Sequence, residues 1–340
     1  MYTLGVNLSH HSSIALLKDN EVLLYIQEER LNRRKDFHGV PLKSLDLINR
    51  YTKVIDVLVF KAASNQAAAT VIRHLSKQNI SVKHIERGRS KHHLAHAASA
   101  FHMSGMDHAC VIVIDGAGSS VHLGKLHGEL IRANETTSIY DAKFSNSYQC
   151  VYKKCVAGYY NKVDFDIDPQ MVNIVKEAYG TDNCELTKQH DIGWKYYSTT
   201  KRIGFGNTGE GKTMGLSGYG SSSDSTQQAK EAYNIQQELN KLFIDIAKFG
   251  LDKVKTNNLV LGGGCALNII GNSLIKRHFP NINIFADPVA SDASIALGAA
   301  VETFYRFTSS KDKLFFSSYQ GPKHKIETPY IYECARKYSI

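Results

Sequence analysis

The chain repeats one arrangement of predicted elements: an apolar strand, a polar loop and a hairpin. The first copy starts at residue 2, and the second begins about 107 residues later, at residue 109. The predicted strands are residues 2–8, 13–17 and 21–27 in the first copy and residues 109–114, 121–126 and 129–133 in the second. Internal duplication strongly limits the folds open to a chain, because each copy must bury a similar apolar face.

Two halves that each aim a hairpin loop at a shared cleft are how the actin, sugar-kinase and Hsp70 type of fold holds a nucleotide. We therefore predict an α/β protein with a duplicated actin-like ATPase fold, and with nucleotide and metal in the central cleft. The first half would comprise residues 1–108 and the second residues 109–318. Residues 153–198, which are rich in Tyr, Asp and Lys, are predicted to form an irregular insertion in the second half.

Composition narrows the class of protein. The 340 residues are 43% hydrophobic and 21% charged, and no apolar run reaches the roughly 18 residues that a membrane span needs. Scattered cysteines without a Cys-x-x-Cys pair favour free thiols in a reducing compartment, so we expect a cytoplasmic protein without a secretory signal or a membrane partner. The net charge of +9 favours anionic partners, although many small-molecule enzymes are equally basic.

The segment His92-His93-Leu94-Ala95-His96 is the first candidate for a functional site. Residues four apart share one face of a helix, so His92 and His96 could bind one divalent metal and leave positions for a carboxylate, water or substrate. Surface histidines or satisfied core histidines would give the same spacing. The next apolar strand ends in Asp115-Gly116-Ala117-Gly118, which suits phosphate. Histidines beside such a loop favour nucleotide chemistry.

Two later loops carry further candidates. Gly262-Gly263-Gly264 lies between a buried strand and a helix, where glycines let a phosphate or adenosine approach backbone N–H groups. A tight turn would explain these glycines equally well. Asp292 lies at the start of a predicted helix at residues 293–305, where an N-cap aspartate is the simplest interpretation. A long amphipathic helix is predicted at residues 225–249.

Five segments resemble, in order, motifs of the O-carbamoyltransferases, a family that includes nodulation-factor, cephamycin and tobramycin carbamoyltransferases. Residues 92–101 resemble the histidine box of the family, and residues 27–33 resemble its Gln-Glu-Glu-Arg-Phe-x-Arg motif. The other matching segments are residues 210–220, 262–268 and 291–300. Together they span nearly the whole chain.

The resemblance implies a reaction. Carbamoyl phosphate and ATP would give carbamoyl-adenylate and pyrophosphate, and the carbamoyl group would then pass to a hydroxyl of an acceptor. The metal would bind His92, His96 and Asp292 and contact the nucleotide phosphates. Iron(II) suits two histidines and a carboxylate, with zinc, manganese and magnesium as alternatives.

The resemblance also implies roles for residues outside the metal site. His10 would lie beside the carbamoyl group, and Asp115 is a second candidate for acid–base or phosphate-side work. The predicted nucleotide-binding residues are Gly116, Glu210, Lys212, Gly215, Gly262, Gly263, Gly264 and Asn268.

The family carries a second, carboxyl-terminal domain similar to the threonylcarbamoyl-adenylate synthase. Residues 319–340 resemble the start of the linker to that domain, so we expect the transfer half alone. Such a chain would need carbamoyl-adenylate from a separate synthase protein. The acceptor stays open between a sugar-like small molecule and a hydroxymethylated pyrimidine in DNA.

Two other functions compete with this interpretation. The tRNA threonylcarbamoyl transferases share the fold, but they read His-x-Glu-Gly-His where this chain has residues 92–96, and Ser-Gly-Gly-His where it has residues 115–118. Both differences favour the O-carbamoyl side. A non-catalytic nucleotide-binding module is the third hypothesis, and the intact His92, His96 and Asp292 argue against it.

Overall fold

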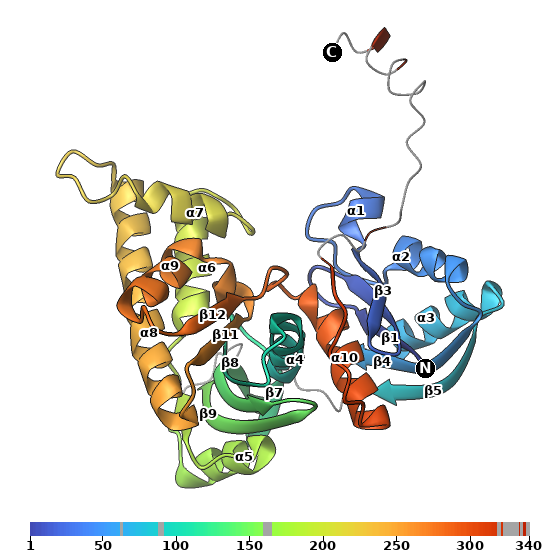
Figure 1. The fold of residues 1–340 in the computed structure, drawn as a ribbon. Helices are drawn as coiled ribbons and strands as arrows, with labels where there is room; N and C mark the ends of the chain where they lie inside the picture. Colours follow the sequence, from blue (N-terminus) through green and yellow to red (C-terminus); the bar gives the residue numbers. More distant parts are fainter. Residues whose placement is uncertain are drawn as a thin grey trace.

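A computed structural model of the chain describes residues 1–61, 64–87, 92–158 and 165–317, together with residues 321, 333, 336 and 337. The tail predicted at residues 319–340 therefore lies almost entirely outside the described residues. The fold is α/β, with two sheets that each carry one copy of the repeat. Figure 1 shows these sheets on either side of helices α4 (His92–Ser104) and α10 (Ser294–Thr308).

The first sheet has the strand order β3-β2-β1-β4-β5. Its strands are β1 (Tyr2–Asn7), β2 (Ser13–Lys18), β3 (Glu21–Gln27), β4 (Val54–Lys61) and β5 (Ser81–Arg87). β2 pairs with β3 in antiparallel fashion, so the predicted hairpin forms. β1 pairs with β2 in antiparallel fashion and with β4 in parallel, so the later strands extend the other edge. The helical segments are α1 (Glu29–Asn32), α2 (Leu42–Asp46), η1 (Leu47–Arg50) and α3 (Asn65–Lys77). α2 and α3 share a buried apolar cluster with this sheet through Leu45, Val71 and Leu75.

The second sheet has the order β10-β9-β8-β6-β11-β12, and β7 pairs with β8 off this path. Its strands are β6 (His108–Ile114), β7 (Ser120–Leu126), β8 (Glu129–Lys143), β9 (Ser147–Ala157), β10 (Cys184–Thr187), β11 (Asn258–Gly262) and β12 (Asn283–Ala286). The helical segments are α5 (Pro169–Tyr179), α6 (Ile192–Arg202), α7 (Glu210–Ser217), α8 (Gln227–Val254), η2 (Gly264–Leu267) and α9 (Ile269–His278). The long helix predicted at residues 225–249 is α8, and its apolar stripe, including Leu239 and Phe243, lies in the core.

The two copies of the repeat differ in one strand. We predicted a third strand at residues 129–133, but β8 continues to Lys143. Residues 129–134 of β8 pair with β7, whereas residues 137–143 pair with β6. The hairpin of the second copy is therefore displaced from the central strand, and Glu135 and Thr136 lie where β8 changes partner.

Helices α4 and α10 pack against each other between the two sheets. α10 also contacts β1 and β2 of the first sheet, while α4 contacts β6 and β11 of the second. Two glycines make this close packing sterically feasible: a Cβ on Gly298 would lie 1.8 Å from the Ala95 carbonyl oxygen, and one on Gly5 would lie 2.0 Å from that of Ala296. This packing brings the start of α4 and the loop before α10 together.

The prediction of irregular structure for residues 153–198 is wrong for the described part of that segment. It holds the end of β9, helix α5, strand β10 and the first half of α6. Apolar residues of α5, including Val175 and Tyr179, form a buried cluster with β7, β8 and β9. Sequence reasoning missed α5 although its apolar residues Met171, Ile174, Val175 and Ala178 recur at helical spacing.

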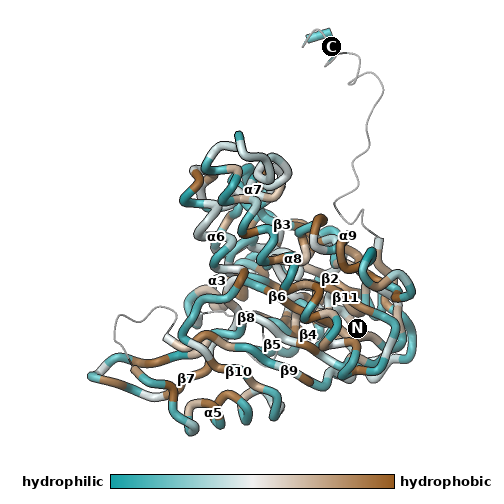
Figure 2. Tube along the Cα trace, turned by 90° about the vertical axis from the view of Figure 1, so that its left-hand side faces the viewer, coloured by the Kyte–Doolittle hydropathy of each residue, from teal (hydrophilic) through white to brown (hydrophobic). Residues whose placement is uncertain are grey.

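The distribution of hydropathy agrees with the burial. In Figure 2 brown, apolar stretches follow the inner strands, whereas the chain around α7 is largely teal and white. Within the described residues, no helix combines the length and apolarity that crossing a membrane requires. The five described cysteines are free, and Cys334 lies outside the described residues.

Candidate functional site

The two histidines predicted from their spacing face each other at the start of α4. The ring centroids of His92 and His96 lie 4.8 Å apart, and their Nε2 atoms are separated by 3.1 Å. His96 is fully buried and His92 is 9% exposed, so neither is a surface histidine. Their ring nitrogens point at carboxylates, which a simple packing role would not require.

Asp115 and Asp292 complete this cluster. Asp115 Oδ2 lies 3.1 Å from His92 Nε2 and 3.2 Å from His96 Nε2. Asp292 Oδ1 lies 3.6 Å and 3.8 Å from the same two nitrogens. Asp292 is not the N-cap of α10, a position that Ala293 occupies, so its carboxylate is available to the cluster. Asp115, predicted for acid–base or phosphate-side work, thus lies among the predicted metal ligands.

Neighbouring hydroxyl groups orient the two histidines. Ser294 Oγ lies 2.8 Å from His96 Nδ1, which leaves His96 Nε2 facing the carboxylates. The backbone N–H of His92 donates to Ser119 Oγ at 2.9 Å and so fixes the first residue of α4 to the loop after β6. Partners of this kind, which hold a ring in one orientation, are typical around metal-binding histidines.

The donor set fits a divalent metal. One ligand atom from each of the four side chains lies within 4.8 Å of the others. Two atoms that each bind a metal at about 2.1 Å, at angles between a right angle and a tetrahedral one, lie about 3.0–3.4 Å apart. The contacts of Asp115 with both histidines fall in this range, and those of Asp292 are slightly longer. Two imidazoles with two carboxylates suit zinc, iron(II) or manganese better than calcium.

Charge within the cluster is complementary. Burial disfavours the charged form of His92, but the carboxylates of Asp292 and Asp115 outweigh it and raise the pKa of this histidine. Burial would raise the pKa of Asp115, yet hydrogen bonds from His92 and His96 hold it well below its ordinary value. The carboxylate of Asp115 is therefore ionised at neutral pH, as cation binding requires.

The first sheet reaches the cluster through the loop after β1. Asn7 Nδ2 donates to the backbone oxygens of His10 and Asp292, both at 2.9 Å. Ser9 Oγ lies 3.5 Å from Asp292 Oδ2. The side chain of His10 is exposed and its ring lies 5.3 Å from that of His38. The structure thus places the backbone of His10 beside the loop that carries Asp292, while its catalytic role stays a prediction.

The glycine loop after β11 packs against the same cluster. Gly263 has a φ of +79°, and a Cβ there would lie 2.5 Å from the Ile114 carbonyl oxygen, so only glycine fits. A Cβ on Gly264 would lie 3.1 Å from Asp115 Oδ1, and one on Gly262 would lie 3.4 Å from the His96 carbonyl oxygen. Gly116, directly after Asp115, has open space around its Cα. These predicted nucleotide-binding glycines therefore border the cluster.

Three further residues that were predicted to bind the nucleotide, Glu210, Lys212 and Gly215, lie on helix α7 of the second half. Burial raises the pKa of Glu210, the first residue of α7, with Asp36 adding to the shift and His11 opposing it. Lys212 and Gly215 are exposed on the same helix, and nothing lies within 4 Å of a Cβ position on Gly215. Their roles in nucleotide binding stay predictions.

Asn268 has a structural role in the protein. Its Oδ1 accepts hydrogen bonds from the backbone N–H of Gly271 at 2.9 Å and from Gln236 Nε2 at 3.0 Å. Its Nδ2 donates to Gln236 Oε1 at 2.9 Å. Asn268 is therefore the N-cap of α9, and a direct contact of its side chain with a nucleotide would require these bonds to rearrange.

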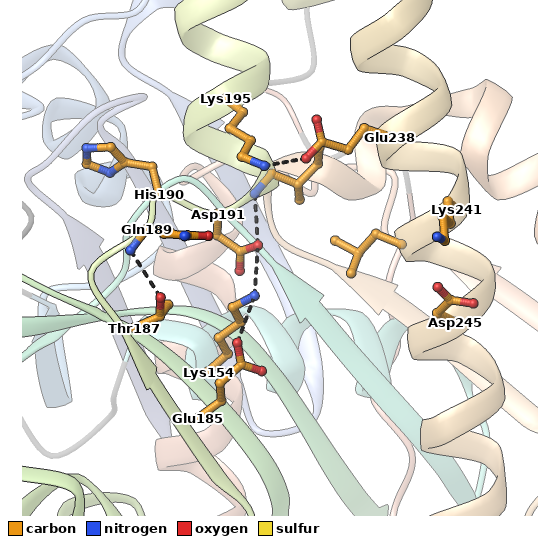
Figure 3. Close-up of a pocket in the computed structure, with 12 residues that line it drawn as sticks. Lys154, Glu185, Thr187, Gln189, His190, Asp191, Lys195, Glu238, Lys241 and Asp245 are labelled. Carbon is orange, nitrogen blue, oxygen red and sulfur yellow. Dashed lines mark hydrogen bonds and ion pairs between the residues drawn. The ribbon is translucent and has the colours of Figure 1, made fainter. Parts of the chain in front are cut away.

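A charged pocket of about 270 Å³ lies beside the start of α6 (Figure 3). None of the predicted site residues lines it. Lys154 Nζ lies 3.2 Å from Glu185 and 3.5 Å from Asp191, and Lys195 pairs with Glu238. Because these charges neutralise one another, the pocket offers little attraction to a charged ligand. Asp191 instead caps α6, whose Gly193 packs closely on the Asp115 backbone.

Residues 225–301 match the sequence family described as Carbamoyltransferase N-terminus. Over these residues the chain is similar to carbamoyltransferase N-terminal domains. The matched residues run from α8 through the glycine loop to α10, and they include Asp292. The resemblance to carbamoyltransferases that the motifs indicated is therefore confirmed.

Individual relatives are remote. The nodulation protein NolNO of Sinorhizobium fredii is 25% identical over 325 residues, which cover 86% of this chain and 46% of NolNO. An uncharacterized protein of Synechocystis is 24% identical over 386 residues, which cover 96% of this chain and 62% of that protein. The chain thus spans about half to three fifths of the length of these curated relatives.

A solved structure agrees with the predicted architecture. Full-length HypF, in a phosphate- and nucleotide-bound form, superposes with a TM-score of 0.55 and 12% identity over 90% of this chain and 47% of HypF. At that identity the likeness concerns the fold alone. The predicted actin-like ATPase fold is confirmed.

Sequence reasoning missed a buried acid and a buried lysine next to the cluster, Glu135 and Lys153. Their side chains are fully buried, and Lys153 Nζ lies 2.7 Å from Glu135 Oε2. A signal for Glu135 was present, since it follows Glu28 by 107 positions, which is the offset of the repeat. Lys153 has no such counterpart, and its strand carries a second lysine, Lys154, that faces the charged pocket.

Proposed function

We propose that the chain is the transfer domain of a metal- and ATP-dependent O-carbamoyltransferase. One observation carries the proposal: His92, His96, Asp115 and Asp292 converge at the junction of the two halves of an actin-like fold. The match of residues 225–301 to carbamoyltransferase N-termini supplies the reaction class. The nucleotide-bound form of HypF, 47% of which this chain matches in fold, supports a nucleotide substrate here by analogy of fold.

The transfer step would exchange one carbon–oxygen bond for another. The acceptor hydroxyl oxygen bonds to the carbamoyl carbon, and the bond from that carbon to the adenylate phosphate oxygen breaks. AMP leaves with the electron pair, and the hydroxyl proton passes to a ring nitrogen of His10. His10 suits this role because its side chain is exposed on a loop held beside Asp292.

The other site residues would bind and orient the adenylate. Backbone N–H groups of Gly116 and of residues 262–264 would face the phosphate. The open space beside Gly116 would admit it, and the Gly116 N–H, which donates to Asp115 Oδ1 at 2.7 Å, would exchange that bond for one to the phosphate. His92, His96, Asp115 and Asp292 would hold the divalent cation. When bound, that cation would supply a Lewis acid that neutralises charge on the phosphate as AMP departs.

A mass-spectrometric transfer assay tests the proposal. The chain would receive carbamoyl phosphate, ATP and iron(II), with an aminoglycoside or hydroxymethylated DNA as the acceptor, first alone and then with a carbamoyl-adenylate synthase protein. We expect one acceptor to gain the mass of one carbamoyl group. If neither acceptor gains mass even with the synthase present, transfer to these two acceptor classes is wrong.

His96→Ala and His108→Ala form a matched pair for that assay. His96→Ala removes a predicted metal ligand and should abolish transfer. His108 is a partly exposed histidine that lies 2.7 Å from Asp141, away from the cluster, and its loss should leave transfer unchanged. Equal transfer by both variants would show that the reaction does not need His96. No transfer by the wild-type chain, even with the synthase protein present, would favour the non-catalytic nucleotide-binding module.

Salt distinguishes the two acceptor classes. A DNA acceptor would bind largely through its phosphates to a chain of net charge +9, so transfer should fall steeply as salt rises. Transfer to a small sugar-like acceptor should change little over the same range. A salt-insensitive rate on DNA would remove the nucleic-acid acceptor.

A further inference from the structure

A fully buried ion pair lies directly behind the cluster. Glu135 of β8 and Lys153 of β9 have no exposed side-chain surface, and Lys153 Nζ lies 2.7 Å from Glu135 Oε2. Lys153 also donates to Ser138 Oγ and, at 3.3 Å, to Tyr140 OH. Burying two charges is unfavourable unless each is well paired. The geometry of the second carboxylate oxygen indicates what this pair does.

Glu135 Oε1 joins two segments that carry predicted metal ligands. It accepts the backbone N–H of His93 at 3.1 Å and that of Ser119 at 3.0 Å. Ser119 in turn accepts the backbone N–H of His92 on its Oγ at 2.9 Å. One carboxylate therefore ties the first turn of α4 to the end of the loop that begins at Asp115.

The loop is also pressed against this carboxylate. A Cβ on Gly118 would lie 2.6 Å from Glu135 Cγ and 2.9 Å from His93 Cδ2. The backbone of Gly118 donates to the Glu135 carbonyl at 2.8 Å, and the backbone of Glu135 donates to that of Ser119 at 3.1 Å. Asp115 is held at the other end, because its backbone donates to the Thr136 carbonyl at 2.9 Å. Backbone hydrogen bonds thus hold residues 115–119 along Glu135 and Thr136, where β8 changes from pairing with β7 to pairing with β6.

We propose that Glu135 and Lys153 are positioning residues of the metal centre, which set the separation between His92 and Asp115. This inference rests on the proposed metal site and names residues that act through its ligands. The distance in question is the 3.1 Å between His92 Nε2 and Asp115 Oδ2. Shifts of a few tenths of an ångström there would change the fit to any cation.

Lys153 has a definite part in this arrangement. Burial would raise the pKa of Glu135, but the charge of Lys153 holds it below its ordinary value; reciprocally, Glu135 raises the pKa of Lys153 despite burial. An ionised carboxylate can accept the two backbone N–H groups on one oxygen while its other oxygen faces the ammonium group. Without Lys153 the carboxylate would be an unpaired buried charge.

The first copy of the repeat supplies a matched control. Glu28 lies 107 positions before Glu135, is 3% exposed, and accepts the backbone N–H of Ser44 at 2.8 Å and the Ser44 hydroxyl at 2.7 Å. It therefore binds the start of a helix as Glu135 does, but that helix is α2, which carries none of the four ligand candidates. Glu28→Leu removes the same kind of buried carboxylate without touching the cluster.

The experiment is a Co²⁺ titration of the full chain, read by visible absorption. The variants are Glu135→Leu with Lys153→Met, which removes both charges together, Ser119→Ala, and the control Glu28→Leu. We expect about tenfold or greater weakening of Co²⁺ binding with an altered spectrum for the double variant, in line with losses of other supports of metal ligands. Ser119→Ala should weaken binding by a smaller factor, and Glu28→Leu should leave affinity and spectrum unchanged.

The outcomes separate this inference from the metal site itself. If the wild-type chain binds Co²⁺ but the double variant binds it equally well, the positioning role is wrong and the metal site stands. Equal weakening by Glu28→Leu would point to general destabilisation and would also overturn the role. A wild-type chain that binds no Co²⁺ would overturn the metal site together with this inference. Should the double variant fail to fold, Ser119→Ala against Glu28→Leu decides the question.

Discussion

The two copies of the repeat share a local arrangement but use it differently. In each, a glutamate donates its backbone N–H to a serine 16 positions earlier: Glu28 to the Ser12 carbonyl at 2.9 Å, and Glu135 to the Ser119 carbonyl at 3.1 Å. In each, the glutamate carboxylate accepts backbone N–H groups at the start of a helix. The duplication therefore extends beyond the strands to a buried carboxylate that anchors a helix.

The copies differ in what surrounds that carboxylate. Glu28 follows the end of β3 and is satisfied by backbone N–H groups and the Ser44 hydroxyl. Glu135 lies within the long β8 and has Lys153 as a counter-ion. The loop of the first copy contributes Asn7 contacts to backbone oxygens, whereas that of the second contributes the Asp115 carboxylate. One supporting arrangement thus serves packing in the first copy and, by our proposal, holds a cation site in the second.

The largest effect should come from removing the lysine that distinguishes the second copy. Lys153→Met leaves Glu135 as an uncompensated buried charge, which typically destabilises a protein by about 3–5 kcal/mol. Lys154→Met, one residue along the strand, removes a partly exposed partner of Glu185 and Asp191 and should cost no more than about 1 kcal/mol. Urea unfolding of both variants in the presence of a chelator measures the difference. Equal losses of stability in the two variants would contradict the larger contribution that we assign to the buried Glu135–Lys153 pair.

The second effect concerns the carboxylate that the second loop supplies. Asp115→Asn keeps the shape of the side chain but removes the charge that faces His92 and His96, so Co²⁺ binding should weaken about 100-fold. Asp141→Asn is the control, because Asp141 also faces a histidine nitrogen, that of His108 at 2.7 Å, outside the cluster. Isothermal titration calorimetry with Co²⁺ gives both affinities. An unchanged affinity for Asp115→Asn would exclude Asp115 as a ligand.

Acid should destabilise the packing of helix α4 in particular, because two buried histidines lie on it. Burial lowers the pKa of His93 and of His102 to about 3, from 6.5. Below about pH 6.5 these histidines bind protons in the unfolded chain but stay neutral in the folded protein. Their contribution to the free energy of unfolding is therefore complete above pH 6.5 and is lost as the pH drops towards 3. Each histidine should contribute about 1.4 kcal/mol per pH unit in the middle of this window. No histidine is buried within residues 1–61 and 64–87.

His102→Phe isolates one of these contributions. The ring of His102 stacks on Tyr305 at 4.3 Å with an interplanar angle of 8°, so phenylalanine can replace its packing without a titrating group. The free energy of unfolding of the chelator-treated variant should depend less steeply on pH between 6 and 4. A slope equal to that of the wild-type chain would show that His102 is not kept neutral by burial.

The smallest effect should come from the first copy. Ser44→Ala removes one hydroxyl donor from Glu28 but leaves its backbone donors, so we expect a loss of about 1–2 kcal/mol in stability. Co²⁺ affinity should stay within twofold of the wild-type value, because α2 contacts none of the ligand candidates. A marked loss of affinity would break the distinction between the two copies.

Sequence patterns were sufficient for much of the fold. Alternating apolar runs located β1, β2, β3, β6 and β7, and the glycines at residues 262–264 correctly marked the turn after β11. They were insufficient for residues 153–198, where β9, α5 and β10 were missed. The extension of β8 to Lys143 was also missed, because a strand that changes partners midway carries no local mark of the change.

The site divides in the same way. The four-residue spacing of His92 and His96 determined by itself that both rings share a helix face, since helix geometry is local. Tertiary structure decided which carboxylates lie next to these two rings. β11 lies beside β6, and α10 packs on α4, so Asp115 and Asp292 converge although they are far apart in the chain. The pairing of Glu135 with Lys153 likewise depends on the register of β8 and β9, which no periodicity within either strand specifies.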